Sequence, residues 1–372
     1  MRDRQSGEIS GKPNDEALNR TDRGGSSPPR ISIAAAPVTS STHSADAAPW
    51  PALILVLRHK TNALMTPGGD SDTAIGMKSV AAADQTIDSV VDVVLPDRQR
   101  LPVVLASPHS GRVYPESFVA ASRLDPIALR RSEDSFVDEI FTPAVKLGIP
   151  MVRALFPRAF VDTNREPFEL DPDMFDDVLP GYVNTRSPRV AAGLGTIARV
   201  VAQGQDIYQR KLRFDDALDR VQNYYQPYHD RLRAAIDQTH RQFGSCLLID
   251  CHSMPSIGVE VRERGRSGAP DFVLGDCFGS ACAPIISDNA ERWLSLQGYR
   301  VVRNTPYAGG YTTRHYGKPR TGVHALQIEI NRGLYMQEES FTRKPYLSRL
   351  AEEMAHLVQL LATTPQVARA AE

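Results

Sequence analysis

The amino-acid sequence predicts an α/β fold, and two observations support this prediction. From Leu101 onward, short apolar runs alternate with longer segments in which the apolar residues recur at helical spacing. Hydrophobic residues make up 41% of the 372 residues and charged residues 23%, which is typical of a globular protein that buries a large core. No internal repeat interrupts this pattern, so we expect a single folded domain over residues 86–366.

The strands are expected where short apolar runs are bounded by polar or turn-forming residues. The first of them, LPVVLA, is uncharged throughout and suits a strand buried on both faces. The runs lie at residues 101–106, 149–155, 158–162, 246–250, 271–274, 299–303 and 325–331.

Three helices are expected between these strands. Residues 132–147 begin with Ser-Glu-Asp-Ser, which offers capping oxygens and places acidic side chains in the first turn. Residues 207–243 form a long helical stretch that we expect to break near Pro227, and residues 285–297 form the third helix.

Residues 1–85 differ in composition from the rest of the chain. They are rich in Ser, Pro, Gly, Ala, Asp and Arg and have no sustained helical or strand period. A targeting peptide fits poorly, because acidic residues are interspersed and the apolar run at 50–57 lies far from Met1. We expect this segment to be disordered, or to be an extension that precedes a true translation start at Met65 or Met77.

Charge and cysteine content exclude several classes of protein. The chain carries 43 Lys+Arg against 44 Asp+Glu, so no bulk field attracts nucleic acid or an anionic membrane. Residues 50–57 are too few to span a membrane. The four cysteines are too few for a secreted disulfide scaffold and lack the CxxC pairs of a structural zinc site. We expect a reduced, cytoplasmic protein that acts on a small molecule.

Two histidines follow predicted strands at the edge where α/β proteins form their sites. His109 lies in SPHSG, directly after the first strand, and His252 lies in DCHSM, directly after CLLI. A lone histidine in such a place is more often capped or solvated. Two in similar settings favour a shared metal ion, because neutral imidazole is a good zinc ligand.

A third metal ligand is not decided by spacing. Asp134 and Asp138 lie four residues apart on one face of the predicted helix, although Asp134 could simply serve the helix N-terminus. Glu116, seven residues after His109, is a further candidate.

Asn164 and Arg165 together suit a substrate carboxylate. The guanidinium of arginine forms a rigid fork that binds a carboxylate with two hydrogen bonds, and asparagine adds an amide donor beside it. Taken alone, the pair would rather suggest a structural arginine that pairs with Glu166 or Glu169.

Glu329 is an acidic residue inside a strand otherwise suited to burial. In ALQIEIN, Gln327, Glu329 and Asn331 alternate with apolar residues. A buried carboxylate needs a partner or a function, and beside a metal-activated water it can act as a general base. Just upstream, residues 304–315 form a Gly-rich loop with aromatic and cationic side chains, among them Tyr311 and Arg314, that suits a wall around a small anion.

Together these segments resemble the N-formylglutamate amidohydrolase family over residues 103–336. The motifs are SPHSG, SEDSFVD, VDTNREPFELDP, LLIDCHSMPS, DFVLGDCFGSAC, NTPYAGGYTTRHYG and HALQIEINRGLYM, in this order. The resemblance implies a three-layer, zinc-peptidase-like fold with a mixed central sheet flanked by helices. It also implies one Zn²⁺ per chain, or another divalent transition metal, and hydrolysis of N-formyl-L-glutamate to L-glutamate and formate, a reaction of histidine catabolism.

The resemblance also assigns roles to individual residues. His109 and His252 match metal ligands, Asp134 matches the third, and Glu329 matches the catalytic glutamate. Unlike in zinc carboxypeptidase relatives, the acidic ligand cannot come from an HxxE turn, because position 112 is Arg. Asn164 and Arg165 are expected to bind the substrate α-carboxylate. The residues expected around an acidic substrate side chain are Tyr311, Arg314 and Arg320. Asp250 and Asp138 are expected to orient the metal ligands.

Three alternatives stay open. The same residues could act on another N-acyl amino acid or a small peptide. The protein could instead bind acidic amino acids without catalysis, which would leave Glu329 and both histidines without a purpose. A cysteine-based amidohydrolase using Cys251 or Cys277 is weaker, because the sequence identifies no base beside either thiol.

Overall fold

The central sheet has seven strands, in the order β1-β3-β2-β6-β9-β7-β8. The computed structural model describes residues 90–201, 204–257 and 268–368 of the chain. The expectations for residues 1–85 and for the translation start lie outside these residues. The strands of the sheet are β1 (Val91–Val94), β2 (Val103–Ser107), β3 (Met151–Ala154), β6 (Cys246–Met254), β7 (Phe272–Gly275), β8 (Val301–Arg303) and β9 (Val323–Asn331).

The middle of the sheet is parallel and its edges include antiparallel pairs. Strands β3, β2, β6 and β9 run in one direction. Strand β1 is antiparallel to β3, and β7 is antiparallel to β9 but parallel to β8. The carboxyl ends of β2, β6 and β9 therefore meet at one edge, where α/β sheets usually carry their sites.

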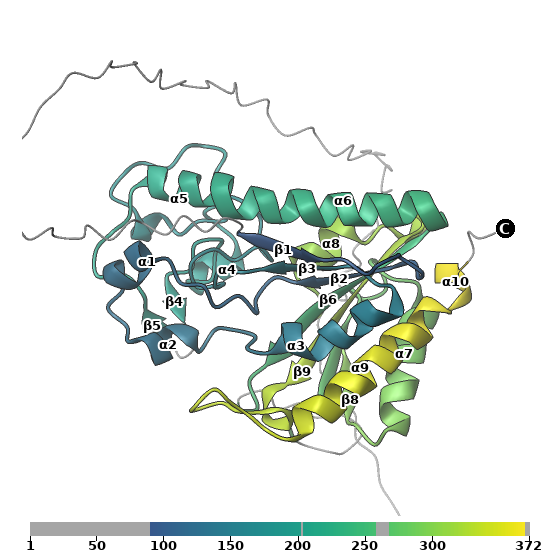
Figure 1. The fold of residues 1–372 in the computed structure, drawn as a ribbon. Helices are drawn as coiled ribbons and strands as arrows, with labels where there is room; N and C mark the ends of the chain where they lie inside the picture. The colour runs from purple at the N-terminus through teal and green to yellow at the C-terminus, as the bar shows by residue number, and fades with distance from the viewer. Residues whose placement is uncertain (1–89, 202–203, 258–267, 369–372) are drawn as a thin grey trace, which may run out of the picture. The chain divides into compact units, whose positions relative to one another are not determined.

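Helices cover both faces of the sheet (Figure 1). Alternate residues of β2 point to opposite faces: Val104 and Ala106 pack into the core beneath α6 (Gln226–Phe243). Val103 and Leu105 pack instead into the core shared with α3 (Val137–Phe141), α7 (Pro284–Leu296) and α9 (Tyr346–Ala362). The prediction of a three-layer α/β fold with a mixed sheet is confirmed.

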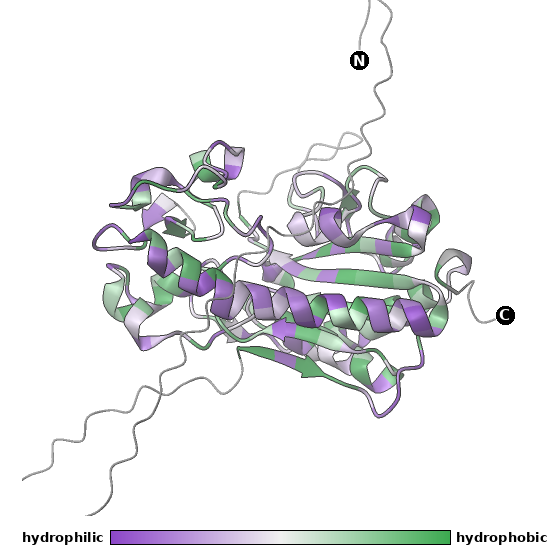
Figure 2. Ribbon diagram, turned by 90° about the horizontal axis from the view of Figure 1, so that it is seen from above, coloured by the Kyte–Doolittle hydropathy of each residue, from purple (hydrophilic) through white to green (hydrophobic). Residues whose placement is uncertain are grey.

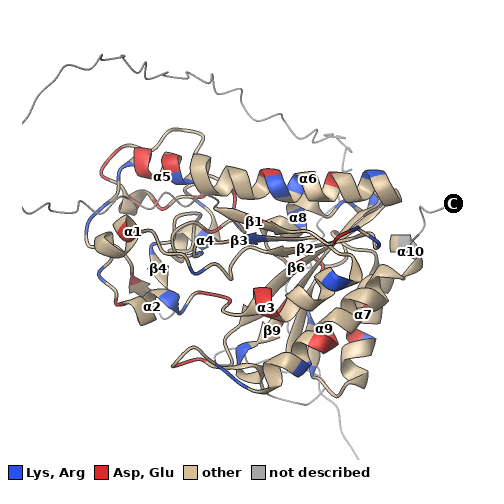
Figure 3. Ribbon diagram, in the orientation of Figure 1, with Lys and Arg blue, Asp and Glu red and all other residues tan. Residues whose placement is uncertain are grey.

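The surface of the layers is polar and their interior is apolar. Seen from above, α6 turns hydrophilic residues outward while the strands beneath it are largely hydrophobic (Figure 2). Charged residues follow the outer faces of the helices and are sparse on the strands (Figure 3). Among the described residues, no helix is both long enough and apolar enough to cross a membrane.

The remaining elements are short. The helices are α1 (Glu116–Ala121), α2 (Pro126–Arg130), α4 (Pro188–Ala191), α5 (Phe214–Arg220), α8 (Tyr311–Tyr316) and α10 (Pro365–Ala368), with 3₁₀ turns at Thr142–Leu147, Pro172–Met174, Pro319–Thr321 and Arg332–Leu334. Two further strand pairs are β4 (Val200–Val201) with β5 (Gln205–Asp206) and β10 (Met336–Gln337) with β11 (Thr342–Arg343).

Four local predictions were wrong for identifiable reasons. Residues 158–162 form a turn rather than a strand, because the N–H groups of Phe160 and Val161 donate to the carbonyl of Pro157. The helix expected over 132–147 begins only at Val137, since Phe136 has a left-handed backbone with φ of 67°. The long helix begins at Phe214 and contains a π-helical turn, Val221–Tyr225, in place of a break. Residues 311–316, expected to be loop, form α8.

Candidate active site

The paired strands β6 and β9 place the site at the edge of the sheet. Strand β6 continues past the predicted end at Asp250, so His252 lies within the strand and not after it. The register sets His252 beside Glu329 and Asp250 beside Gln327. His109 lies two residues beyond the end of β2, which is the other neighbour of β6.

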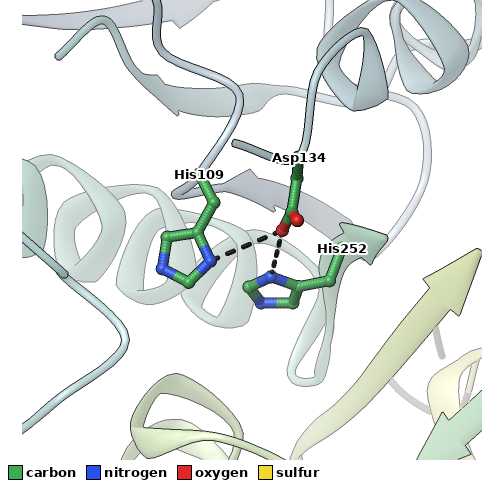
Figure 4. A group of neighbouring side chains, drawn as sticks. All are labelled: His109, Asp134 and His252. Carbon is green, nitrogen blue, oxygen red and sulfur yellow. Dashed lines mark hydrogen bonds and ion pairs between the residues drawn. The ribbon is translucent and has the colours of Figure 1, made fainter. Parts of the chain in front are cut away.

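His109, Asp134 and His252 form one buried cluster, the candidate ligand group for a metal ion (Figure 4). The Nδ1 atoms of both imidazoles face the same oxygen, Asp134 Oδ2, at 3.4 Å from His109 and 3.0 Å from His252. Each of the three residues is at most 2% exposed. The backbone N–H of Asp134 donates to the carbonyl of His109 at 3.0 Å, which fixes the carboxylate beside the first histidine.

A carboxylate holds the outer nitrogen of each imidazole. His109 Nε2 lies 2.7 Å from Asp162 Oδ1, and His252 Nε2 lies 3.0 Å from Asp250 Oδ1. Such contacts fix the tautomer and ring orientation of histidines that ligate metals. The buried Nδ1 of His109 has no hydrogen-bond partner among the described residues.

These donors fit a divalent transition metal ion. Two imidazole nitrogens and one carboxylate oxygen converge, their outer atoms are held in place, and the buried His109 Nδ1 lacks a partner that an ion would supply. Three protein ligands are also the number typical of catalytic zinc sites, which keep a further position open.

The other oxygen of Asp134 is fixed by one neighbour on β6 and one in the 3₁₀ turn that follows β9. Arg332 Nη2 donates to Asp134 Oδ1 at 3.0 Å, and the hydroxyl of Ser253 donates to it at 3.1 Å. Burial alone would raise the pKa of the Asp134 carboxyl, but the close contacts and positive charges of His109 and His252 outweigh it. The pKa therefore lies well below its usual range, and the group stays a carboxylate.

Glu329 lines a cavity beside this group. Burial raises the pKa of its carboxyl to about 8, an effect that the nearby positive charge of His252 opposes. Gln327 Nε2 donates to Glu329 Oε1 at 2.9 Å, and Gln327 Oε1 accepts from the N–H of Gly310 at 2.7 Å. A buried, hydrogen-bonded carboxyl with a raised pKa is suited to general acid–base work.

The cavity has a volume of about 120 Å³ and is rich in arginine. It is lined by His109, Arg158, Asn164, Arg165, Arg189, His252, residues 306–310, Gln327 and Glu329. A Cβ atom at Gly310 would lie 2.2 Å from the side chain of Asn164, so only glycine fits in this wall.

Asn164 and Arg165 stand at the junction between the ligand group and the cavity. Asn164 Nδ2 lies 3.0 Å from His252 Nε2, and Asn164 Oδ1 accepts from the N–H of Thr312. The guanidinium of Arg165 donates to the carbonyl oxygens of Leu194 and Asn164. Burial lowers the pKa of Arg165 to about 10, so its side chain remains a cation.

Several residues expected at the site lie elsewhere. The carboxylate of Asp138 on α3 is buried and pairs with Arg112 and Arg153, and Glu116 is exposed on α1. Neither belongs to the ligand group. Of the residues expected around the substrate, Arg314 and Arg320 are exposed, and the ring of Tyr311 stacks on His315; none of these three lines the cavity.

Other residues take these places, and sequence reasoning missed them. Asp162 contacts His109 and Arg332 contacts Asp134, while Arg158, Arg189 and Tyr307 line the cavity. Three of them lie in quoted motifs: Asp162 in VDTNREP, Tyr307 in NTPYAGG and Arg332 in EINRG. Arg158 lies four residues before Asp162, but Arg189 lies outside every motif and carried no signal.

Comparison with known sequences identifies one family. The family model described as N-formylglutamate amidohydrolase matches residues 101–336. An N-formylglutamate deformylase of Pseudomonas putida is 28% identical over 264 residues, covering 70% of this chain and 91% of the relative. One from Pseudomonas aeruginosa is also 28% identical, over 65% of this chain and 85% of the relative.

Solved structures give a matching result. The crystal structure of an N-formylglutamate amidohydrolase from Ralstonia eutropha JMP134 is 34% identical, with a TM-score of 0.69 over 73% of this chain and 96% of that one. The gene product Atu2144 of Agrobacterium tumefaciens, at 18% identity, has a TM-score of 0.53 over 74% of this chain and 95% of that one, and shares the fold.

Proposed function

The chain belongs to the N-formylglutamate amidohydrolase family, and from this premise we propose that it hydrolyses N-formyl-L-glutamate with the help of a divalent metal ion. Water adds to the formyl carbon, the C–N bond breaks, and formate and L-glutamate leave. The observation that carries the proposal is the meeting of Glu329 and the His109–Asp134–His252 group in one arginine-lined cavity.

Asp134, His109 and His252 would hold the metal ion, with Zn²⁺ as the expected species. When bound, such an ion acts as a Lewis acid and lowers the pKa of water toward ~7. Asp162 and Asp250 keep the two imidazoles oriented, and Arg332 and Ser253 keep Asp134 Oδ2 turned toward them.

Glu329 is the proposed proton-transfer group. Its carboxylate takes a proton from the attacking water and then delivers it to the amide nitrogen as the amine leaves. Gln327 donates to Oε1 of Glu329, so Oε2 is left for this transfer on a side chain that lines the cavity. Burial raises the pKa of this carboxyl toward neutral pH, which suits a group that exchanges a proton with water and with the leaving amine.

Asn164, Arg165 and Arg158 form the proposed binding site for the substrate α-carboxylate. The α-carboxylate is one carbon away from the scissile amide, so its binding groups must lie close to the ligand group. Asn164 meets this condition through its contact with His252, and both arginines are held by the carboxylate of Asp162. Binding there would place the formyl carbonyl beside Glu329.

A cysteine nucleophile has little support. Burial raises the pKa of Cys251 well above its usual value and also raises that of Cys277. Reactive cysteines have lowered pKa values instead. Neither thiol lines the cavity of the ligand group.

Formate release by the full-length chain tests the reaction. We expect turnover of N-formyl-L-glutamate that is lost after dialysis against a chelator, returns with Zn²⁺ and resists thiol alkylation. N-acetyl-L-glutamate, N-formyl-L-aspartate and short peptides serve as competing substrates. Turnover of one of these without turnover of N-formyl-L-glutamate would show that the proposed substrate is wrong. Turnover that persists without metal would show that the reaction needs no metal ion.

Glu329→Gln tests the proton transfer. We expect kcat to fall by roughly 10²–10⁴-fold because the amide cannot accept a proton from water, while metal content stays at the wild-type level. Glu352→Gln, an equal change of charge at an exposed position of α9, is the control and should leave kcat unchanged. Near-normal turnover by Glu329→Gln with metal bound would contradict the role.

A further inference from the structure

Three arginines line the cavity, and they differ in their partners. Arg158 donates to Asp162 Oδ2 at 2.7 Å, and Arg165 Nη2 lies 3.5 Å from the same oxygen. Arg189, on α4, makes no hydrogen bond or ion pair through its guanidinium with any described residue. An unpaired, half-buried guanidinium in a cavity is costly unless a ligand supplies the anion.

The segment that carries Arg189 is anchored beside Arg165. The hydroxyl of Ser187 caps α4 by accepting from the N–H of Val190, and it donates to Glu169. Three residues after α4, the carbonyl of Leu194 accepts from Arg165 Nε at 2.9 Å. These contacts fix the backbone on both sides of Arg189 next to Arg165, and the two arginines line the same cavity.

The order of the groups along the cavity decides which carboxylate each arginine meets. Asn164, which touches His252, and Arg165 beside it in the chain are 4% and 5% exposed, whereas Arg189 on α4 is only half-buried and therefore lies nearer the surface of the cavity. In an N-acyl amino acid, the α-carboxylate is close to the scissile amide, whereas the side-chain carboxylate of glutamate is two methylenes further away. The deeper pair thus matches the α-carboxylate.

We propose that Arg189 binds the side-chain carboxylate of the substrate and thereby sets a preference for N-acyl derivatives of acidic amino acids. This inference rests on the proposed hydrolase function and adds the residue that selects its substrate class. With a dianionic substrate bound, each carboxylate meets a guanidinium, and the excess positive charge of the cavity is neutralised.

The test compares Arg189→Gln with the wild-type chain on N-formyl-L-glutamate and N-formyl-L-glutamine, which differ only in the side-chain carboxylate. We expect kcat/KM for the glutamate substrate to fall by about 10- to 10²-fold, as for loss of a hydrogen-bonded ion pair, with little change for the glutamine substrate. Arg186→Gln, an equal change of charge at an exposed neighbouring position, should leave both values unchanged. Isothermal titration of L-glutamate and L-glutamine gives the same comparison without turnover.

The outcomes separate this inference from the proposed function. An equal loss for both substrates with Arg189→Gln would mean that Arg189 binds the α-carboxylate, and no loss for either would mean that it binds neither. Both results overturn the inference while the hydrolase function stands. Absence of turnover by the wild-type chain on every N-acyl amino acid would instead overturn the proposed function.

Discussion

The two histidines of the ligand group are held alike, but their surroundings differ. Each turns Nδ1 to Asp134 Oδ2 and has an aspartate beside Nε2. Behind His109, Asp162 also accepts hydrogen bonds from Arg158 and from the backbone of Asn164. Behind His252, Asp250 meets the hydroxyl of Thr313 and the amide of Asn164 instead.

We infer from this difference that Asp162 and Asp250 have different roles. Asp162 joins the His109–Asp134–His252 group to Arg158 and Arg165, so a substitution that disturbs the proposed metal site there should also disturb the proposed substrate-binding arginines. Asp250 joins the His109–Asp134–His252 group to α8 and to the neutral amide of Asn164 but contacts none of the described arginines, so it should affect substrate binding less than Asp162 does. Asp162 would then couple metal binding to both arginines of the cavity, whereas Asp250 would reach the substrate-binding residues only through Asn164.

Removing either histidine should have the largest effect. His109→Ala and His252→Ala each delete one ligand, so we expect both proteins to lose tightly bound metal and kcat to fall by roughly 10³-fold. Metal content after gel filtration and formate release measure the two effects. His356→Ala, at an exposed position of α9, is the control. If a variant still bound one metal ion per chain, the histidine that it lacks would not be a metal ligand.

Replacing Asp162 and Asp250, the aspartates beside the two histidines, should distinguish their effects on metal affinity and on substrate binding. We expect Asp162→Asn and Asp250→Asn each to weaken metal affinity by about 10- to 100-fold, because both orient an imidazole. With saturating metal, KM for N-formyl-L-glutamate should rise more in Asp162→Asn than in Asp250→Asn, since Arg158 and Arg165 lose their anchor only in the former. Equal changes of KM in the two variants would contradict this difference in roles.

The sequence predicted the parts of the site that lie near strand ends. His109, His252 and Glu329 could be placed because β2, β6 and β9 are marked by apolar runs, and parallel pairing brings their ends together. Asp134 could only be ranked, because its position depends on the backbone contact with His109 and on the left-handed Phe136 that ends the turn. Neither feature is visible in residue spacing.

The substrate wall could not be predicted, for a related reason. Arg189 reaches the cavity through α4, a helix of four residues whose place is set by contacts of Ser187 and Leu194 with distant segments. Arg314 had the expected charge in the expected loop, but residues 311–316 form a helix that leaves it exposed. The local sequence pattern identifies cationic residues, but contacts between distant segments determine which of these residues line the cavity.

A third buried histidine sharpens the comparison, because its partners are neutral. His229 on α6 contacts the hydroxyl of Tyr316 through Nδ1 and the carbonyl of Thr163 through Nε2. Burial lowers its pKa to about 3, and the nearby charges of His315 and Arg233 act in the same direction. The carboxylates around His252 have the opposite effect there, outweighing burial and raising the pKa.

Acidification should therefore destabilise the fold through His229. Below pH ~6.5 the unfolded chain binds a proton at this residue and the folded chain does not, until the pH approaches 3. Between pH 7 and pH 5, this should cost roughly 2 kcal/mol of unfolding free energy, at ~1.4 kcal/mol per unit below pH 6.5. Replacing His229 with Gln, which keeps a donor and an acceptor, should remove that part of the pH dependence in urea unfolding. The variant and the wild-type chain could instead lose the same free energy of unfolding between these pH values. His229 would then be protonated in the folded protein as well, and its neutral partners would not lower its pKa as they are expected to do.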